Sequence, residues 1–402
     1  MRLRHYFVFV AVVLQACTTA PVGNNESIET RARALATSSL IVDTHIDVPY
    51  RLEDEYEDIS KATAKGDFDY PRALSGGLNA PFMSIYIPAE READGTAYAL
   101  ADKLIDMVEN IAANSPDKFS VAHNTTDVSS DFERGVISLP LGMENGAPIA
   151  GKLENLKHFY DRGIRYITLT HSKSNHICDS SYDEARPWNG LSPFGAELVR
   201  EMNRLGVMVD VSHVSDAAFY DVMKVTKVPP IASHSSARYF TPGFERNMDD
   251  DMIMALAKAG GVIQINYGST FISAKSRASY DQLTKARDAY LEKTGFESGS
   301  PEADAFTENF RAANPFDYAT LDDVLDHFDH VRNLVGIDYV GIGSDYDGVG
   351  DSLPTDLKDV SSYPNLIEGL LRRGYTDTDI RKVLGGNLMR VWRETERYAA
   401  AH

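Results

Sequence analysis

The sequence of 402 residues contains only two cysteines, Cys17 and Cys178. If the Cys17 thiol is modified by lipid, Cys178 has no partner, and an intramolecular disulfide is excluded. The chain is also poor in cations, with 40 Lys and Arg against 59 Asp and Glu and a net charge of −19. This balance argues against nucleic acid as a partner. The fold must therefore depend on a hydrophobic core, which a chain of this length can build.

No apolar run is long enough to span a bilayer, because the apolar stretch near the start covers only residues 7–14. A short basic segment precedes it and Leu14-Gln-Ala-Cys17 follows, which resembles a bacterial lipobox. The pattern predicts a lipoprotein signal peptide at residues 1–16 and a lipidated Cys17. Residues 17–30 would then be a flexible tether that holds the protein on the periplasmic side of a membrane. Simple secretion with cleavage nearby is the alternative.

Apolar, β-rich runs alternate with helical patterns along the rest of the chain. The predicted strands cover residues 40–47, 80–87, 136–144, 164–171, 207–213, 230–234, 262–267 and 339–345. Strands that alternate with helices indicate βαβ units and a parallel sheet, and eight such units predict an α/β fold of the (β/α)8 TIM barrel type. A doubly wound open sheet is the alternative, but it typically has a glycine-rich phosphate turn after an early strand, and none is present.

One domain is expected over residues 31–402, with two insertions. The first, at about residues 53–76, is charged and aromatic and is predicted to form a loop over the barrel. The second, residues 269–315, contains a helical stretch at residues 280–293 and follows the seventh predicted strand. It should therefore border the C-terminal face of the barrel, where such folds carry their active sites.

Groups suited to metal binding stand at the C-terminal ends of six predicted strands. His45 and Asp47 lie two residues apart, so both point to the same face of the first strand. The others are Glu144, His171, His213, His234 and Asp345. Any one of them alone is as well explained by a structural histidine or a turn carboxylate. A barrel converges its strand ends on one cavity, however, and six coincidences there indicate a common site.

Three histidines, one aspartate and one glutamate from this set would suit divalent metals, zinc first. Five such ligands exceed what one catalytic zinc needs, and they fit two metals that share a carboxylate and a water of lowered pKa. The barrel is thus predicted to be of the metal-dependent hydrolase type. The pattern alone does not separate metal-binding histidines from one that contacts substrate.

The same motifs, in the same order, resemble those of the membrane (renal) dipeptidases. They are Asp43-Thr-His45-Ile-Asp47, Gly142-Met-Glu144-Asn-Gly146, Leu169-Thr-His171, Asp210-Val-Ser-His213, Ser233-His234-Ser-Ser236, Glu245-Arg246-Asn247 and Gly343-Ser-Asp345-Tyr-Asp-Gly348. The resemblance covers nearly the whole chain after Ser39. It implies a zinc-dependent metallopeptidase that hydrolyses dipeptides, including those with a C-terminal D-residue.

The resemblance also implies a role for each matching residue. His45 and Asp47 would hold one Zn²⁺, His213 and His234 would hold the second, and Glu144 would bridge them. Three further residues would have catalytic or substrate-binding roles: Asp345 would be the acid/base, His171 would contact the reacting carbonyl, and Arg246 would bind the terminal carboxylate of the substrate.

Two other functions stay open at this point. The first is a different metal-dependent amidohydrolase that acts on N-acyl amino acids or β-lactams. The second is a catalytically idle lipoprotein that only binds ligands, which should have lost a metal ligand or the acid/base, and none is missing. The resemblance also leaves a homodimer open, and the long 269–315 insertion leaves the side-chain preference undecided.

Overall fold

The computed structural model describes residue 1 and residues 27–402. The predicted signal peptide, most of the tether and Cys17 lie outside the described residues. Among residues 27–402, no helix is both long enough and apolar enough to cross a membrane.

The centre of the molecule is a sheet of eight parallel strands in the order β1-β2-β5-β6-β7-β8-β9-β10. Their bounds are Ile41–Ile46, Leu78–Tyr86, Leu141–Glu144, Ile164–Thr168, Met208–Asp210, Ile231–Ala232, Val262–Ile265 and Val340–Ile342. The two outer strands approach each other, because the Asp47 amide donates to the Tyr346 carbonyl at 2.9 Å and Ile46 pairs with Tyr346. The sheet is therefore a nearly closed barrel, and the predicted (β/α)8 fold is confirmed.

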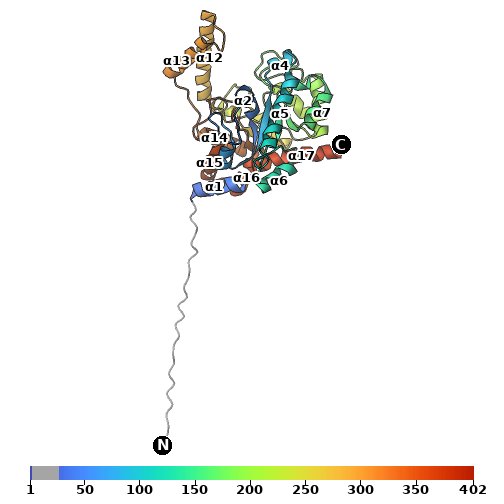
Figure 1. Cartoon of the computed structure of the whole chain (residues 1–402), viewed down its shortest axis with the longest axis vertical. Helices are drawn as coiled ribbons and strands as arrows, with labels where there is room; N and C mark the ends of the chain where they lie inside the picture. The colour runs from blue at the N-terminus through green and yellow to red at the C-terminus, as the bar shows by residue number, and fades with distance from the viewer. Residues whose placement is uncertain (2–26) are drawn as a thin grey trace.

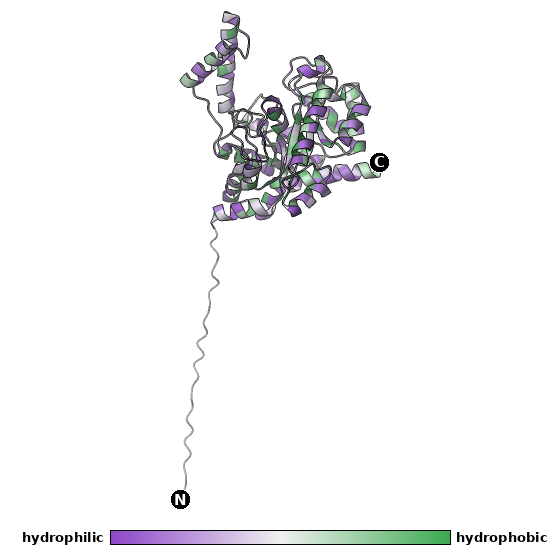
Figure 2. Cartoon of the chain, in the orientation of Figure 1, coloured by the Kyte–Doolittle hydropathy of each residue, from purple (hydrophilic) through white to green (hydrophobic). Residues whose placement is uncertain are grey.

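Helices follow the strands and cover the outside of the barrel (Figure 1). The main ones are α1 (Ile28–Ser38), α5 (Ala97–Asn114), α6 (Thr125–Arg134), α7 (Leu153–Asp161), α8 (Pro193–Leu205), α9 (Asp216–Val225), α10 (Asp250–Lys258), α14 (Leu321–Val335), α15 (Tyr363–Arg372), α16 (Asp377–Arg381) and α17 (Asn387–Ala401). Hydrophilic and hydrophobic residues alternate along these helices (Figure 2). Their apolar residues face inward, as on α8, where Leu198, Val199 and Met202 are buried.

Helix α17 closes one end of the barrel. Its Trp392 lies 5.3 Å from the Phe82 ring, which in turn lies 5.3 Å from the Tyr166 ring. The same cluster includes Val42, Ala80, Met208, Ile231 and Val262, which stand near the starts of their strands. The N-terminal end of the barrel is thus filled with apolar side chains, and the C-terminal end is left for chemistry.

Two predicted segments differ from the structure. Residues 53–76 are not a continuous loop, because they contain the end of α2 (Val48–Asp54) and the helix α3 (Tyr70–Gly76). The Asp69 side chain caps α3 by accepting from the Arg72 amide, and Pro71 fits its first turn. The third predicted strand is split around Pro140 into β4 (Ile137–Ser138) and β5, and β4 pairs instead with β3 (Phe119–Ser120).

The second insertion begins with the short α11 (Ser269–Ile272) and continues as a helical hairpin, α12 (Ala274–Thr294) and α13 (Pro301–Ala313). We call residues 274–313 the arm. The predicted helical stretch lies within α12, and the hairpin projects from the barrel at the upper left of Figure 1. The arm follows β9, as expected, and its residues nearest the barrel border the cavity described below.

Candidate active site

The structure brings all seven groups singled out at the strand ends into one cluster. Each lies in a strand or shortly after its last residue, at the C-terminal end of the barrel. Three overlapping sets have ligand atoms within 4.8 Å of one another: His45 with Glu144 and His234, Glu144 with His171 and His213, and His45 with Asp47 and Asp345. The sequence prediction that these residues meet in one cavity therefore holds for the described structure.

Glu144 occupies the centre of the cluster. Its Oε1 lies 3.1 Å from His213 Nε2 and 3.3 Å from His234 Nε2. Its Oε2 faces the other way and lies 3.4 Å from His45 Nε2, which is itself 3.5 Å from Asp47 Oδ2. One carboxylate thus stands between two pairs of ligand-type groups, which is the position of a bridging ligand in a two-metal site.

The hydrogen bonds of Tyr166 determine which nitrogen of His45 faces the cluster. The Tyr166 hydroxyl donates to the Thr44 carbonyl at 2.9 Å, so its single proton is used there. Its oxygen lies 2.9 Å from His45 Nδ1 and must accept from it. The lone pair of His45 is therefore on Nε2, the atom turned toward Glu144 and Asp47, as metal binding requires.

His234 is oriented by the same logic through a different residue. The Ser233 hydroxyl donates to Asp210 Oδ2 at 2.5 Å and lies 2.7 Å from His234 Nδ1. It must accept from Nδ1–H, which leaves the lone pair of His234 on Nε2. This atom lies 2.8 Å from His213 Nε2, so two imidazoles aim at one point beside Glu144.

The electrostatics of the cluster favour a bound cation. Burial lowers the pKa of His213 and His234 well below the usual value, so both are neutral, as metal ligands must be. Burial also disfavours a charge on His45, yet Tyr166, Glu144 and Asp47 together raise its pKa well above the usual value. The site thus attracts a positive charge at this point, which a metal supplies as well as a proton does.

Unpaired atoms test the fit to a metal directly. His45 Nε2 and Asp47 Oδ1 are buried and make no hydrogen bond to any residue that the structure describes. Such atoms are costly to bury unless a partner satisfies them, and both belong to the ligand set. Nitrogen and carboxylate oxygen donors in this number fit divalent zinc-type metals.

Asp345 lies beside this cluster in a left-handed backbone conformation with φ of 65°. The Asn266 amide donates to its Oδ2 at 2.7 Å, and the Gly268 amide fixes the orientation of Asn266 by donating to Oδ1 at 2.7 Å. Burial raises the pKa of Asp345 well above its ordinary value, and the charges of Asp47 and Glu144 add to the effect. A carboxyl group with a raised pKa beside metal ligands is suited to acid/base chemistry.

Arg246 is only 3% exposed and reaches the same cavity. It donates from Nη1 to Ser235 Oγ and from Nη2 to the His234 carbonyl, both at 2.8 Å. Its neighbour Glu245 is engaged by Arg186 at 2.7 Å instead. Within residues 27–402, Arg246 has no carboxylate partner, so its charge is free to bind an anionic group of a ligand.

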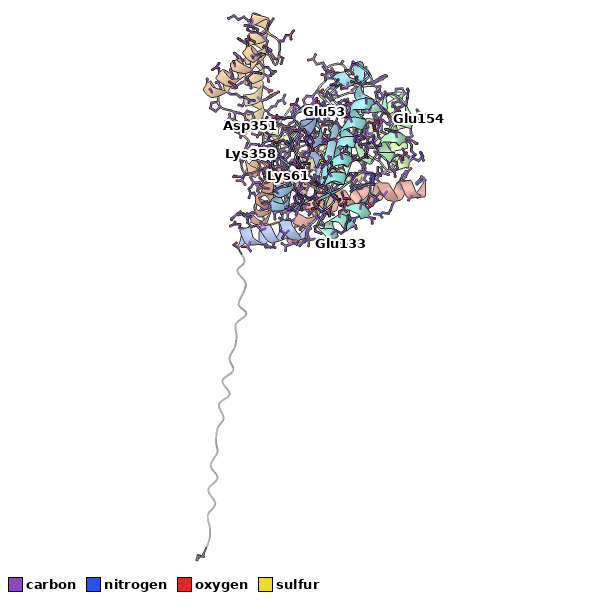
Figure 3. The ribbon with its side chains drawn as sticks, in the orientation of Figure 1. Glu53, Lys61, Glu133, Glu154, Asp351 and Lys358 are labelled. Atoms are coloured by element: carbon purple, nitrogen blue, oxygen red, sulfur yellow. The ribbon has the colours of Figure 1, made fainter. Side chains whose placement is uncertain are left out.

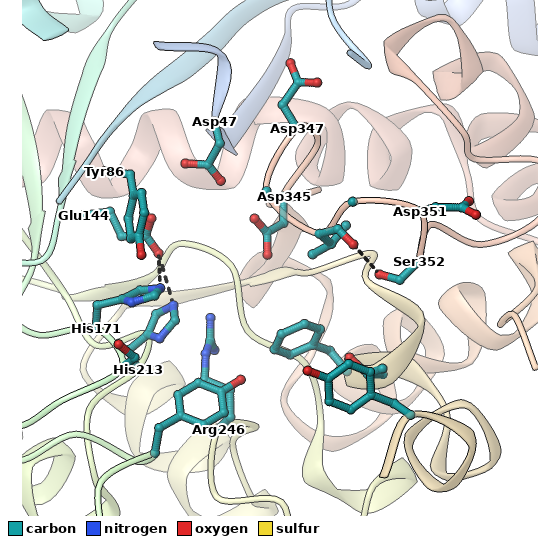
Figure 4. Close-up of a pocket in the computed structure, with 18 of the residues that line it drawn as sticks. Asp47, Tyr86, Glu144, His171, His213, Arg246, Asp345, Asp347, Asp351 and Ser352 are labelled. Atoms are coloured by element: carbon teal, nitrogen blue, oxygen red, sulfur yellow. Dashed lines mark hydrogen bonds and ion pairs between the residues drawn. The ribbon is translucent and has the colours of Figure 1, made fainter. Parts of the chain in front are cut away.

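A cavity of about 750 Å³ joins these groups (Figure 4). Its inner wall includes Asp47, Glu144, His171, His213, Arg246 and Asp345. The outer wall adds Arg277 and Tyr280 from α12, Arg311 from α13, and Phe316, which follows the arm. The position of the insertion after the seventh strand indicated that this segment borders the site, but no local motif marked these residues.

His171 lies next to Glu144 and His213 and also lines the cavity, so its position fits either a metal ligand or a substrate contact. Its Nε2 is 3.5 Å from Glu144 Oε1, and its ring is 4.2 Å from that of His213. The Tyr86 ring packs against it at 4.8 Å and holds it against the cavity wall. Burial lowers the pKa of His171, so it is neutral and can hydrogen-bond a substrate carbonyl when its Nε2 carries the proton.

Comparison with known proteins identifies the family to which the chain belongs. Residues 29–402 match the family described as membrane dipeptidase, peptidase family M19. The chain belongs to the membrane dipeptidase family. An uncharacterised dipeptidase of Schizosaccharomyces pombe is 32% identical over 386 residues, which cover 92% of this chain and 84% of that one.

Solved structures agree with this family assignment. The probable dipeptidase PvdM of Pseudomonas aeruginosa superposes with a TM-score of 0.79 at 26% identity, covering 92% of this chain and 99% of that one. A metallopeptidase of Rhodobacter sphaeroides, solved with a phosphinate mimic of the dipeptide L-Ala-D-Ala, gives a TM-score of 0.73 at 23% identity, covering 89% and 100%. The second likeness is one of fold, and the family resemblance predicted from the motifs is confirmed.

Proposed function

We propose that this membrane dipeptidase family member hydrolyses the peptide bond of free dipeptides with two zinc ions. His45 and Asp47 would hold one ion, His213 and His234 the other, and Glu144 would bridge them. The position of Glu144 between the two sets, at 3.1–3.4 Å from their nitrogens, is the observation that carries this proposal. When bound, such a pair supplies Lewis acidity for a carbonyl and lowers the pKa of a shared water.

The remaining steps belong to residues of the chain. Arg246 binds the C-terminal carboxylate through its planar guanidinium. This contact orients the substrate and selects peptides with one residue after the scissile bond. His171 donates a hydrogen bond to the carbonyl of the scissile bond. Asp345 accepts a proton from the attacking water and returns it to the leaving amine. The Asn266 amide at 2.7 Å holds Asp345 in position for both transfers.

The proposed range includes dipeptides with a D-residue at the C-terminal position. The Rhodobacter sphaeroides metallopeptidase, which shares the fold, was solved with a mimic of such a dipeptide. In the present chain, Arg246 would bind the terminal carboxylate, which L- and D-residues share, within a cavity of about 750 Å³.

Metal analysis combined with a dipeptide panel tests the proposal. We expect about two zinc equivalents per chain, because five donor groups exceed the needs of one site. Alanyl dipeptides with L- and D-residues should be hydrolysed, and N-acetyl amino acids should not. One equivalent at full activity would contradict the two-metal site, and turnover of N-acyl amino acids alone would favour a different amidohydrolase.

We also propose that the mature protein is anchored by lipid at Cys17 on the periplasmic side of the membrane. The support comes from the sequence, where a basic start and a short apolar run precede Leu14-Gln-Ala-Cys17. Mass spectrometry of the mature N-terminus should find a diacylglyceryl-modified Cys17. An unmodified N-terminus at another residue would indicate simple secretion.

A further inference from the structure

The outer half of the cavity is lined by two arginines of the arm, for which the reaction proposed above has no use. Arg277 lies in the first turn of α12, and Arg311 lies near the end of α13. Both line the same cavity as Arg246 and several of the seven residues at the strand ends, which we call the strand-end cluster (His45, Asp47, Glu144, His171, His213, His234 and Asp345). Five carboxylates line the cavity as well, namely Asp47, Glu144, Asp345, Asp347 and Asp351, so the partners of each arginine decide which charges are available to a ligand.

Arg277 is held by aromatic rings with its terminal nitrogens left free. Its Cζ lies 4.1 Å from the centre of the Phe244 ring, and its Nε lies 3.1 Å from Asp281 Oδ1. In the part of the chain that the structure describes, its side chain makes no other ion pair within 4.0 Å. A guanidinium fixed by stacking, with unused donors toward a cavity, is suited to recognise a carboxylate.

An aromatic cluster connects Arg277 to Arg246. Phe244 lies 5.7 Å from Phe271, and the Arg246 Cζ lies 5.4 Å from the same Phe271 ring. The Tyr182 ring also lines the cavity and lies 6.0 Å from the Phe244 ring and 5.9 Å from the His213 ring. The two arginines therefore line the same cavity and are joined through this aromatic cluster.

Among residues 27–402, Asp281 pairs with the Nε of Arg277, and the carboxylates at the rim of the cavity have other partners. Asp351 accepts from the Tyr318 hydroxyl at 2.7 Å and lies 3.9 Å from Lys358 Nζ, below the base of the arm (Figure 3). Asp347 is engaged by Arg51 at 3.1 Å. No carboxylate of residues 27–402 lies within 4.0 Å of the Arg311 guanidinium, so Arg311 and the terminal nitrogens of Arg277 are available to an anionic group.

We propose that Arg277 and Arg311 form a second anion subsite, which binds an acidic side chain on the C-terminal residue of the dipeptide. The proposal rests on the function proposed above, because Arg246 must hold the α-carboxylate of that residue. The side chain then starts next to Arg246. The inner end of the cavity is closed by the strand-end cluster, so the side chain points outward along Tyr182 toward the arm.

Two substrate pairs test the subsite. Alanyl-aspartate and alanyl-asparagine, with the second residue in both L and D forms, differ only in the charge of the C-terminal side chain. Wild-type kcat/KM should be about ten-fold higher for the acid, because one partly screened charge pair contributes roughly a factor of ten. Aspartyl-alanine and asparaginyl-alanine move the same charge to the first residue and should show no such preference.

The variants are Arg277→Gln, Arg311→Gln and the double substitution. In the double variant, the ratio of kcat/KM for alanyl-aspartate to alanyl-asparagine should fall close to one. Arg287→Gln is the matched control, because Arg287 lies on the same helix but does not line the cavity. It should keep the wild-type ratio. Added salt should reduce the ratio in the wild type but leave it unchanged in the double variant.

Calorimetric binding of the same pair to the Asp345→Asn enzyme provides a readout without turnover, and it should show the same preference. If neutral dipeptides are hydrolysed but alanyl-aspartate and alanyl-asparagine have equal kcat/KM, the subsite proposal is overturned. The proposed dipeptidase function would then still stand. An equal preference at the first residue, or one that persists in the double variant, would also overturn it. Failure to bind or hydrolyse any dipeptide would overturn both proposals together.

Discussion

The strand-end cluster and the arm line one cavity, but they are supported very differently. His45, Glu144 and His234 are 0%, 4% and 1% exposed, and the two histidines are oriented by hydrogen bonds that reach Tyr166 of β6 and, through Ser233, Asp210 of β7. In the arm, α12 buries only Ser276 and Leu283, and α13 buries only Ala303. Groups that must keep fixed distances stand on the barrel, whereas groups that select among substrates stand on a segment with little core of its own.

The contrast extends to the backbone. His213 and Asp345 adopt left-handed conformations with φ of 68° and 65°, which non-glycine residues rarely keep. Such conformations cost about 1–3 kcal/mol each and persist only where the surroundings fix them. The barrel provides that support at its strand ends. The arm contains a left-handed residue only at glycines, Gly295 and Gly299, where the cost is small.

Asp345→Asn should give the largest effect on the barrel side of this comparison. The amide keeps the shape and the hydrogen bond to Asn266, but it cannot accept a proton from water. We expect kcat to fall about 10²–10⁴-fold, as for loss of a positioned acid/base, with metal content unchanged. Steady-state kinetics and elemental analysis check this. Near wild-type turnover would assign the proton transfer to another group, with His171 first in line.

Arg246→Ala should follow, because it removes the buried charge that we propose binds the C-terminal carboxylate of the substrate. We expect a loss of about 2–5 kcal/mol in kcat/KM on free dipeptides and much less on dipeptides amidated at the C-terminus. Arg186→Ala, which removes a partly exposed ion pair with the neighbouring Glu245, is the matched control. An equal loss on acid and amide would mean that Arg246 supports the loop rather than binding the carboxylate.

Ser233→Ala should weaken the metal site without touching a ligand. It breaks the link from Asp210 to His234 Nδ1, so the orientation and tautomer of the imidazole are no longer fixed. Zinc affinity should fall about 10–100-fold, as is usual for such supporting residues. Ser236→Ala is the control, because that hydroxyl donates only to the Asn266 carbonyl at 3.2 Å. Equal zinc affinities in the two variants would contradict this role for Ser233.

The sequence predicted the strand-end cluster because two simple regularities place its residues. A period of two places His45 and Asp47 on one face, and barrel closure brings the other strand ends to them. Tyr166 was not predicted, since a tyrosine in a buried strand looks like ordinary core. The direction of its hydroxyl depends on β1, which does not pair with β6 and whose Thr44 carbonyl it contacts across the barrel.

The position of the arm and the helix in the first insertion were not predicted from the sequence for a similar physical reason. Helix α12 was predicted, but its position over the cavity depends on how the hairpin leaves β9, which no local pattern encodes. Residues 53–76 were wrongly predicted as a loop, because the cap and proline that start α3 were outweighed by the charged composition. In both segments, non-local contacts decide what the local signals leave undetermined.

The smallest effect should come from the arm itself. Tyr290 and Phe306 stack across the hairpin with ring centroids 4.4 Å apart and planes 11° from parallel, and both are only partly buried. Phe306→Ala should cost about 1 kcal/mol, the typical worth of an aromatic pair, and the cost should stay within the arm. Hydrogen exchange should accelerate across α12 and α13 and stay unchanged in the barrel strands.

Phe328→Ala provides the comparison on the barrel wall. Phe328 lies on α14 and is 0% exposed, so its removal leaves a cavity in the common core. The loss of unfolding free energy should be about 3–5 kcal/mol, with faster exchange throughout the barrel. If Phe306→Ala destabilised the barrel to a similar degree, the arm would be part of the same cooperative unit. Substrate selection would then rest on the same packing that holds the metal ligands, and the two regions would not be separable.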